Sequence, residues 1–419
     1  MAHCPNPLYK GPAPLKVRHM IAPFNLRDNP KMFEDPAASP FLFSLFPGTV
    51  CLSVNGPFLC IGVQEALPPK PWPKTVAGLI PWFYCDSQED ANSLAIPFGI
   101  AAKSKRRIGG GLDGHATWEG DATDWEGICG AVQKDFREQS VAITEIIYLW
   151  GFVAIVLLNR DVDLTKLPYR VGRIGCRYLF EDELGRSAPP PARRMTDPAP
   201  GERPDNGNHA TLQPGLRITS GYIPGGQQQY MSTTTGVLVK DRDGNEYMTA
   251  AAQGFPTACG HNVYRPVKLK AGEEFDNNIT FEKNEDTPST AAVPLGVFLT
   301  PAEDHQSPSR LRGADSLWLA SSRDMGPIEG SYVTQSKRCV NPGATEQHWV
   351  QSIWAYVGGV DQENTYCGSA MMRARPDNDA DVLDVVGFFE YAPAGGVLDG
   401  WCRGTSSVEL VNRGFTLLT

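Results

Sequence analysis

Apolar and polar positions alternate along this chain in short runs, a pattern that predicts many strands and few helices. Residues 141–158 are rich in β-branched side chains and predict either a pair of strands or a helix that runs into a strand, and residues 169–180 alternate like a further strand. A helix is predicted over residues 88–105. Residues 1–75 contain many prolines and predict a helix-poor arm.

A proline-rich segment, residues 185–210, interrupts this pattern. It contains Pro189, Pro190 and Pro191 in a row, and such a segment continues neither a helix nor a central strand. We therefore predict three parts in an α+β chain. They are an arm with an α/β region over 1–184, a linker over 185–210 and a β domain over 211–419.

Two hairpins are predicted in the last part, because each consists of two strand-like runs joined by a turn of Asp, Asn, Gly or Pro. Gln253 directly follows the first hairpin and Cys367 directly precedes the second. The paired runs are 233–240 with 246–252, and 369–375 with 382–391.

The residues beside these hairpins resemble a known superfamily. The strings Y-M-T-A-A-A-Q-G-F at 247–255, T-Y-C-G-S-A at 365–370 and V-V-G-F-F at 385–389 resemble trypsin-like proteins of the chymotrypsin type. More closely, they resemble uncharacterised fungal proteins that pair an N-terminal α/β region with such a domain. The resemblance implies a double β-barrel over 211–419, with the active site in the cleft between two six-stranded barrels.

The resemblance also assigns positions to a catalytic site. Gln253 stands at the position of the base histidine, and Cys367 stands at the position of the nucleophile. The backbone N–H groups of Thr365 and Cys367 stand at the oxyanion hole. A strand with Val386, Gly387 and Phe388 is expected to lie at a sheet edge and to pair with an extended peptide or protein.

Three departures from the superfamily pattern predict impaired catalysis. Glutamine at 253 does not titrate near neutral pH and accepts no proton from a nucleophile. Thr365 replaces the glycine whose backbone forms half of the oxyanion hole, and a β-branched residue resists that conformation. The strand pair that carries the triad aspartate is missing near residues 263–273, so the first barrel is expected to be truncated. Asp315 mimics that aspartate, but its place in the chain suits the second barrel.

The favoured hypothesis is a catalytically impaired pseudo-protease that keeps a peptide-binding cleft. One alternative is an active cysteine peptidase that uses Cys367 with an unrecognised base, for which His261 is the candidate. The other is a structural or interaction protein that acts through its N-terminal region. The oligomeric state stays open.

Charge and cysteine content restrict the partners. The net charge of −9 argues against nucleic-acid binding, and the one basic run, 103–107, is interpreted as a solvated helix end. None of the ten cysteines forms a C-x-x-C pair, so neither a metal nor another cofactor is expected.

No secretory signal is visible, and the most apolar stretch, 149–158, is shorter than the roughly 20 residues that span a membrane. We therefore expect a cytoplasmic protein with reduced thiols and no membrane partner. Cys51 and Cys60 are the expected exception, because they flank the turn at residues 55–57 and face each other across a hairpin.

Overall fold

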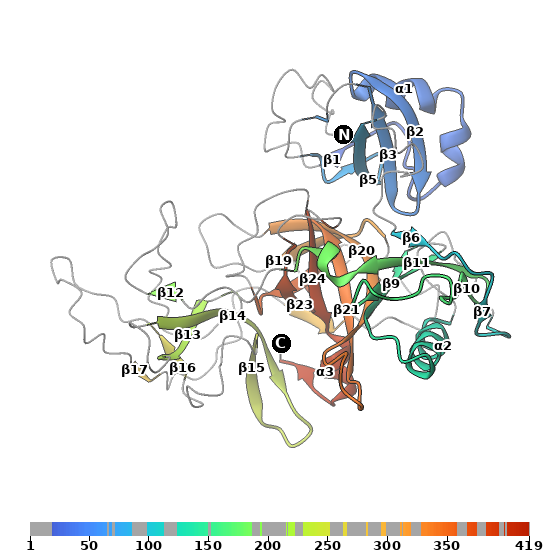
Figure 1. The fold of residues 1–419 in the computed structure, drawn as a ribbon. Helices are drawn as coiled ribbons and strands as arrows, with labels where there is room; N and C mark the ends of the chain where they lie inside the picture. The colour runs from blue at the N-terminus through green and yellow to red at the C-terminus, as the bar shows by residue number, and fades with distance from the viewer. Residues whose placement is uncertain are drawn as a thin grey trace.

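The computed structural model consists mainly of β-strands with few helices (Figure 1). It describes residues 19–64, 67–68, 72–85, 99–112, 124–149, 152–186, 193–194, 215, 217–222, 229–251, 263–265, 282–283, 295–298, 311, 313–319, 328–357, 367–374, 383–393, 398 and 400–418.

The described residues between 19 and 85, here called the N-terminal unit, form a small sheet, one α-helix of eight residues and one 3-10 helix of five residues, which agrees with the expectation of few helices in this part. Prolines do not prevent these helices because they lie in the first turn, where no backbone N–H is needed: Pro30 begins η1 and Pro40 is the third residue of α1. The order in the main sheet is β2-β3-β5, and β1 pairs with β4. The elements are β1 (His19–Met20), η1 (Pro30–Glu34), α1 (Ala38–Leu45), β2 (Thr49–Asn55), β3 (Phe58–Val63), β4 (Thr75–Val76) and β5 (Ile80–Cys85).

The next region is a sheet of β8, β9 and β11 that is buried on both faces. Alternate residues of β8 and β9 pack against α2 on one face and against the N-terminal unit on the other, which explains the continuous apolar run of 141–158. The predicted strand pair is confirmed. The elements are β6 (Ile100–Ala101), β7 (Arg107–Ile108), α2 (Trp125–Glu138), β8 (Ile143–Leu149), β9 (Phe152–Leu157), β10 (Arg170–Val171), β11 (Ile174–Phe180) and η2 (Glu181–Leu184).

The helix predicted over 88–105 is wrong where it can be compared. Residues 99–105 are not helical and contain β6, while residues 86–98 lie outside the described part. The region's helix is α2, which begins at an Asp124 N-cap whose side chain accepts from the N–H of Gly127.

The C-terminal region contains a closed, six-stranded, antiparallel barrel. Its strands pair in the ring β19-β20-β21-β24-β23-β22, and β22 pairs again with β19. The predicted hairpin over 369–391 is confirmed as β22 and β23. The strands are β19 (Ser316–Leu319), β20 (Ile328–Cys339), β21 (Trp349–Tyr356), β22 (Ala370–Ala374), β23 (Leu383–Tyr391) and β24 (Trp401–Ser406), with β18 (Leu295–Phe298) beside β23 and α3 (Val408–Asn412) after β24.

Glycines and register shifts allow the barrel strands to bend and approach closely. The ladders of β20 with β21, β22 with β23 and β23 with β24 each contain a shift of register. At Gly404 of β24 a Cβ atom would lie 2.7 Å from the carbonyl oxygen of Phe388, and at Gly387 of β23 it would lie 2.5 Å from that of Thr405. Each strand therefore approaches the backbone of the other closely at a glycine, Gly387 opposite Ser406 and Gly404 opposite Phe389.

A separate sheet follows the order β12-β14-β13-β16-β17, with β15 and β25 also paired to β14. The predicted hairpin over 233–252 is confirmed as β14 and β15. Within the described residues this sheet does not close into a second barrel. The strands are β12 (Arg193–Arg194), β13 (Arg217–Tyr222), β14 (Gln229–Lys240), β15 (Glu246–Ala250), β16 (Val263–Arg265), β17 (Glu282–Lys283) and β25 (Thr416–Leu417).

Strands from both sides of the predicted linker share one sheet. β20 of the barrel pairs with β8, so that Ser336 lies opposite Ile147. The boundary at 185–210 stays a prediction, but the two parts that it separates are joined by a strand ladder.

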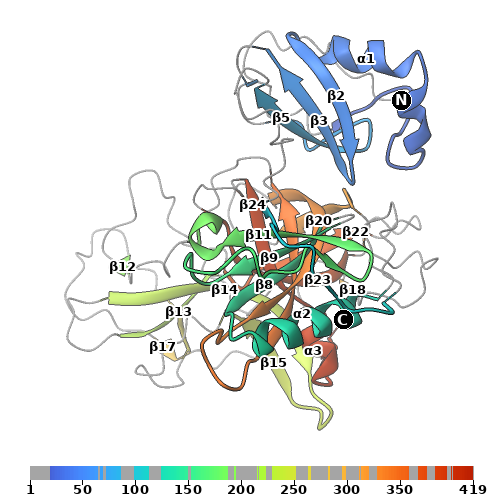
Figure 2. The same ribbon diagram turned by 45° about the vertical axis from the view of Figure 1, so that its right-hand side comes forward.

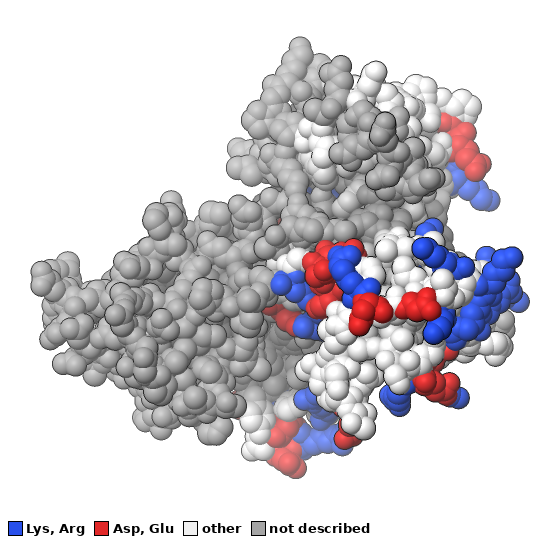
Figure 3. All heavy atoms as spheres, viewed as in Figure 1, with Lys and Arg blue, Asp and Glu red and all other residues white. Residues whose placement is uncertain are grey.

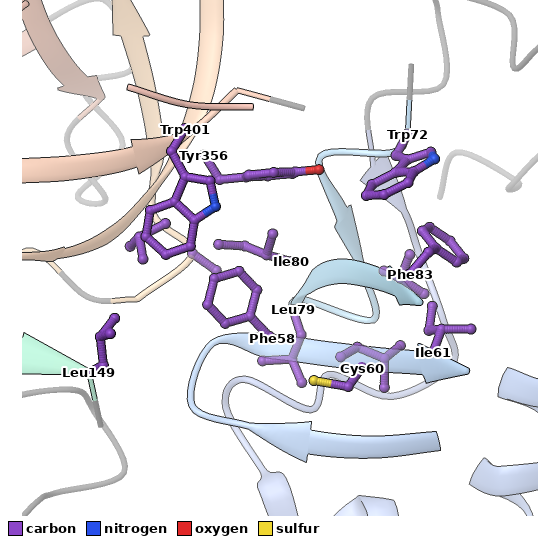
Figure 4. Close-up of a cluster of buried hydrophobic side chains, with 14 of the residues drawn as sticks. Phe58, Cys60, Ile61, Trp72, Leu79, Ile80, Phe83, Leu149, Tyr356 and Trp401 are labelled. Atoms are coloured by element: carbon purple, nitrogen blue, oxygen red, sulfur yellow. The ribbon is translucent and has the colours of Figure 1, made fainter. Parts of the chain in front are cut away.

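The N-terminal unit also packs on the barrel, above it in Figures 1 and 2. Figure 4 shows Phe58 and Ile80 of the unit facing Tyr356 and Trp401 of the barrel. The rings of Phe58 and Trp401 are 5.8 Å apart between centroids. One apolar core thus connects residues of β1 and β3 with residues of β21 and β24.

The fold class is α+β with a β-rich C-terminal region, as expected. In the part of the chain that the structure describes, none of the helices is long and apolar enough to cross a membrane.

Candidate functional site

The motif residues Cys367, Gly368 and Ser369 form the turn that leads into β22. Two backbone hydrogen bonds of 2.8 Å hold it against β23, one from Gly368 N to Phe389 O and one from Phe389 N to Ser369 O. Gly368 has a φ of 95°, which glycine adopts without strain. The glycine of the motif is therefore required by the turn itself.

The thiol of Cys367 lies in the interior of the barrel. Cys367 is only 2% exposed and packs in an apolar cluster with Leu317 and Ile353. Its Sγ donates a hydrogen bond of 2.7 Å to the carbonyl oxygen of Glu390. A thiol that donates to a carbonyl keeps its proton, whereas nucleophilic attack needs the thiolate.

Ser369, which the sequence analysis left without a role, is fully buried as well. Within the described residues its hydroxyl has no hydrogen-bond partner. Two potential nucleophiles thus lie within this turn, and neither reaches solvent.

The turn meets the β14–β15 hairpin at Gly236. Thr234 N donates to Cys367 O at 2.9 Å. A Cβ atom at Gly236 would lie 2.2 Å from Oγ1 of Thr249 and 2.8 Å from the carbonyl oxygen of Gly368. The structure therefore brings the end of the first hairpin and the start of the second together at one glycine, as a site between two β units requires.

The remaining catalytic candidates, Gln253, Thr365 and His261, lie outside the described residues. Thr249 precedes Gln253 by four positions, but the distance from Gln253 to Cys367 stays a prediction. The oxyanion-hole role of Thr365 and Cys367 stays a prediction as well.

Val386, Gly387 and Phe388 are not on an edge strand, and that expectation is wrong. β23 pairs with β22 on one side and with β24 and β18 on the other, so its backbone groups are taken by the barrel. A closed barrel removes the edges of its strands. Pairing with an extended peptide is therefore not available there.

Behind the turn lies a network of buried charges. The Glu390 carboxylate accepts from Arg403 and Arg338, and Arg403 lies 3.3 Å from Glu145. Arg186, from η2's C-terminal side, also binds Glu145. Glu145 and Arg403 are 0% and 1% exposed at their side chains. The network joins β8 to three strands of the barrel.

The network controls the ionisation of Glu145. Burial alone raises the pKa of this carboxyl. The charges of Arg403 and Arg186 and the hydrogen bond from Ser336 lower the pKa by a larger amount, so the net pKa lies below the ordinary value. Glu145 is therefore held as a carboxylate.

An ion-pair group and a hydrogen bond also tie the barrel to the N-terminal unit. Asp315 accepts from Arg27 of the unit and from Arg373 of β22, so it acts in ion pairing. Glu329 of β20 binds Nε2 of His19 at 2.9 Å. These polar contacts flank the apolar contacts of Figure 4.

The described cysteines form no disulfide with one another. Cys51 lies opposite Gly62 in the ladder, and Cys60 lies opposite Ser53, so the register does not place the two thiols across from each other. Among the residues with described side chains, no three His, Cys, Asp or Glu gather as a metal site.

Comparisons with solved structures include a weak likeness to a protease. Neither a protein-family model nor a curated protein matches the sequence. Among solved structures, the chain is similar to a serine protease specific for glutamic acid, described as using a histidine triad in substrate binding. The identity is 13%, the TM-score is 0.29, and the match covers 49% of this chain and 100% of that one.

Proposed function

We propose that this chain is a trypsin-like, peptidase-fold protein that binds partners and does not cleave them. The observation that carries the proposal is the place of Cys367: its thiol is buried in the barrel and donates to Glu390 O. The motif at 367–369 keeps its hydrogen-bonded turn, while the Cys367 side chain packs in the apolar interior of the barrel.

Attack on a peptide would require several changes at once. The thiol would have to leave the apolar cluster, lose its bond to Glu390 and ionise. The turn around it is fixed by backbone bonds to β23 and β14. Ser369 offers no substitute, because it is fully buried.

The partner we propose is an extended peptide or protein. β15 is a better site for it than β23, because within the described residues β15 pairs only with β14. Tyr247 on this strand is 46% exposed. Its last residues lie beside the Cys367 turn, and strand addition at such an edge supplies backbone hydrogen bonds.

Purified protein should show no peptidase turnover above that of Cys367→Ala against a broad peptide library. In the native protein, iodoacetamide should label Cys51, which is half-buried, much faster than Cys367, with peptides resolved by mass spectrometry. Cys51→Ala is the matched control for thiol loss. Peptides bound without cleavage should protect the amides of residues 246–250 from hydrogen exchange.

Turnover that disappears in Cys367→Ala and persists in Cys51→Ala would contradict the proposal and support the active cysteine peptidase. Turnover that survives both substitutions would place a catalytic site elsewhere in the chain.

A further inference from the structure

One face of the sheet formed by β7, β10 and β11 concentrates positive charge. The stretches 99–112 and 164–180 contain eight Lys and Arg and no Asp or Glu, although the chain has a net charge of −9. Figure 3 shows the blue side chains gathered on the right, where Figure 1 places β7 and β10. We call this surface the basic face.

Strand alternation separates these cations from the core. On β11 the side chains of Ile174, Cys176 and Tyr178 pack in the cluster that includes α2, and Arg177 points to the exposed side. The basic face is therefore the side of the sheet opposite α2. Alternation and register place Arg107, Arg170 and Arg177 on this side, and Lys103, Lys105 and Arg173 are exposed in the adjoining loops, which we include in the basic face.

The register places like charges directly opposite each other. Arg170 of β10 pairs with Arg107 of β7, and both are exposed. Their guanidinium carbons lie 5.6 and 5.4 Å from the ring centroid of Tyr169. On the other side of Arg170, the residue opposite it is Gly175 of β11, so no side chain stands beside the two arginines at that position. Opposed like charges destabilise a sheet, so the arrangement favours a bound counter-charge.

We propose that the basic face binds single-stranded nucleic acid through its backbone phosphates. Four of the six exposed cations are arginines, which bind phosphate in a bidentate manner, and two of these, Arg107 and Arg170, lie beside the ring of Tyr169. A membrane surface fits less well, because Ile100 of β6 is the one large apolar side chain exposed in the described stretches 99–112 and 164–180.

This proposal reverses the expectation drawn from net charge. Net charge averages over the whole molecule, whereas the cations of the basic face come from two segments far apart in sequence that only the pairing of β10 with β7 brings together. It is independent of the proposed function of the Cys367 turn.

The test measures binding of a fluorescent oligo-deoxythymidine to the full chain by anisotropy at several salt concentrations. Each phosphate contact on a single strand contributes about −0.7 to the slope of log Kobs against log salt, so four to six contacts predict a slope of about −3 to −4. Arg107→Gln and Arg170→Gln should each make this slope less negative by about 0.7, and each should weaken binding roughly fivefold to tenfold at low salt.

The same variants remain foldable, because each removes one of two opposed charges. Without oligonucleotide their Tm should stay equal or rise. Lys134→Gln is the matched control, since Lys134 is 78% exposed on α2, on the other side of the sheet, and should leave affinity and slope unchanged.

Failure of the wild-type chain to bind, salt-independent binding, or equal loss in Lys134→Gln would overturn the proposal. The proposal would also be overturned if the chain bound phosphatidylserine vesicles or poly-glutamate but not the oligonucleotide, and if that binding were lost in Arg107→Gln and Arg170→Gln.

Discussion

At the scale of the residue, the charge of Glu145 depends on the groups that surround it. Its side chain is completely buried and receives hydrogen bonds from Ser336 and from the indole of Trp354, in addition to its arginines. A buried carboxylate costs several kcal/mol to desolvate unless charge and hydrogen bonds compensate. Glu145 is therefore tolerated only because strands distant in sequence surround it.

Glu145→Gln should lower the free energy of unfolding by about 3–5 kcal/mol, because it leaves Arg403 and Arg186 buried with one carboxylate fewer. The control is Glu126→Gln: Glu126 pairs with Lys337 but is 71% exposed at its side chain, so about 0–1 kcal/mol is expected. Urea unfolding at pH 7 measures both. Equal effects of the two variants would mean that the network adds no stability beyond a surface pair.

The stability of the network should also depend on pH. The folded-state pKa of Glu145 lies below the ordinary value of 4.5, so its contribution is complete above that pH and is lost as the pH falls through the folded pKa. The gap between wild type and Glu145→Gln should thus be constant near neutrality and shrink below about pH 4.5. A gap unchanged at pH 3 contradicts this assignment.

At the scale of the element, the close approach of β23 and β24 sets the curvature of the barrel beside the Cys367 turn. Gly404 faces both the backbone of β23 and the side chain of Met371 from β22. Because this contact involves backbone, a larger residue cannot be accommodated by rotating a side chain. The small residue is a requirement of the pairing.

Gly404→Ala should destabilise the chain by about 1–3 kcal/mol, because the new Cβ would lie 2.4 Å from Met371 Sδ and 2.7 Å from Phe388 O. Gly343→Ala is the matched control: no atom lies within 4 Å of its Cβ position and its φ is not positive. That variant should be neutral or more stable by up to about 1 kcal/mol. Thermal unfolding compares the two, and a neutral Gly404→Ala would exclude tight packing there.

The elements that the sequence predicts well are those with local signals. The hairpins β14–β15 and β22–β23 have both strands and their turn within one short stretch. The sequence of α2 also carries a local helix signal, because Asp124 can cap its first turn and apolar residues follow at helical spacing. The pairing of β8 with β20 and of β7 with β10 joins distant segments, so no local pattern indicates it. The network of Glu145 and the basic face depend on those pairings.

The candidate site divides in the same way. The position of Cys367 before a hairpin follows from its own motif and is confirmed. The direction of its thiol depends on the closure of the barrel, which no short string encodes. The edge position of Val386 failed for the same reason, since only the whole ring shows that β23 has neighbours on both sides.

At the scale of the whole molecule, the region before residue 185 covers one side of the closed barrel and extends its sheet. It supplies the ladder partner of β20, a carboxylate for Arg403 and the apolar cover of Trp401. A domain that lacked this region would expose each of these groups. We therefore expect the described strands on both sides of residues 185–210 to fold as one unit.

The fragment 211–419 should therefore be less soluble and less stable than the full chain. Without β8 the edge of β20 at residues 336–338 is open, because β19 pairs only with residues 328–331, and Arg403 is left buried beside fewer carboxylates. Expression of the fragment and of the full chain side by side, with urea unfolding and a dye for exposed apolar surface, tests this. A fragment as stable as the full chain would establish 185–210 as a true domain boundary.

The pairing of β8 with β20 also has a consequence for synthesis on the ribosome. Ser336 and Glu145 are 191 positions apart, and at 5–20 residues per second the second strand emerges roughly 10–40 s after the first. During that interval β8, β9 and β11 have formed no ladder on the side that β20 will occupy, and an open strand edge readily pairs with other chains. We therefore expect the nascent protein to need a chaperone that shields this edge until the barrel arrives to cover its first sheet.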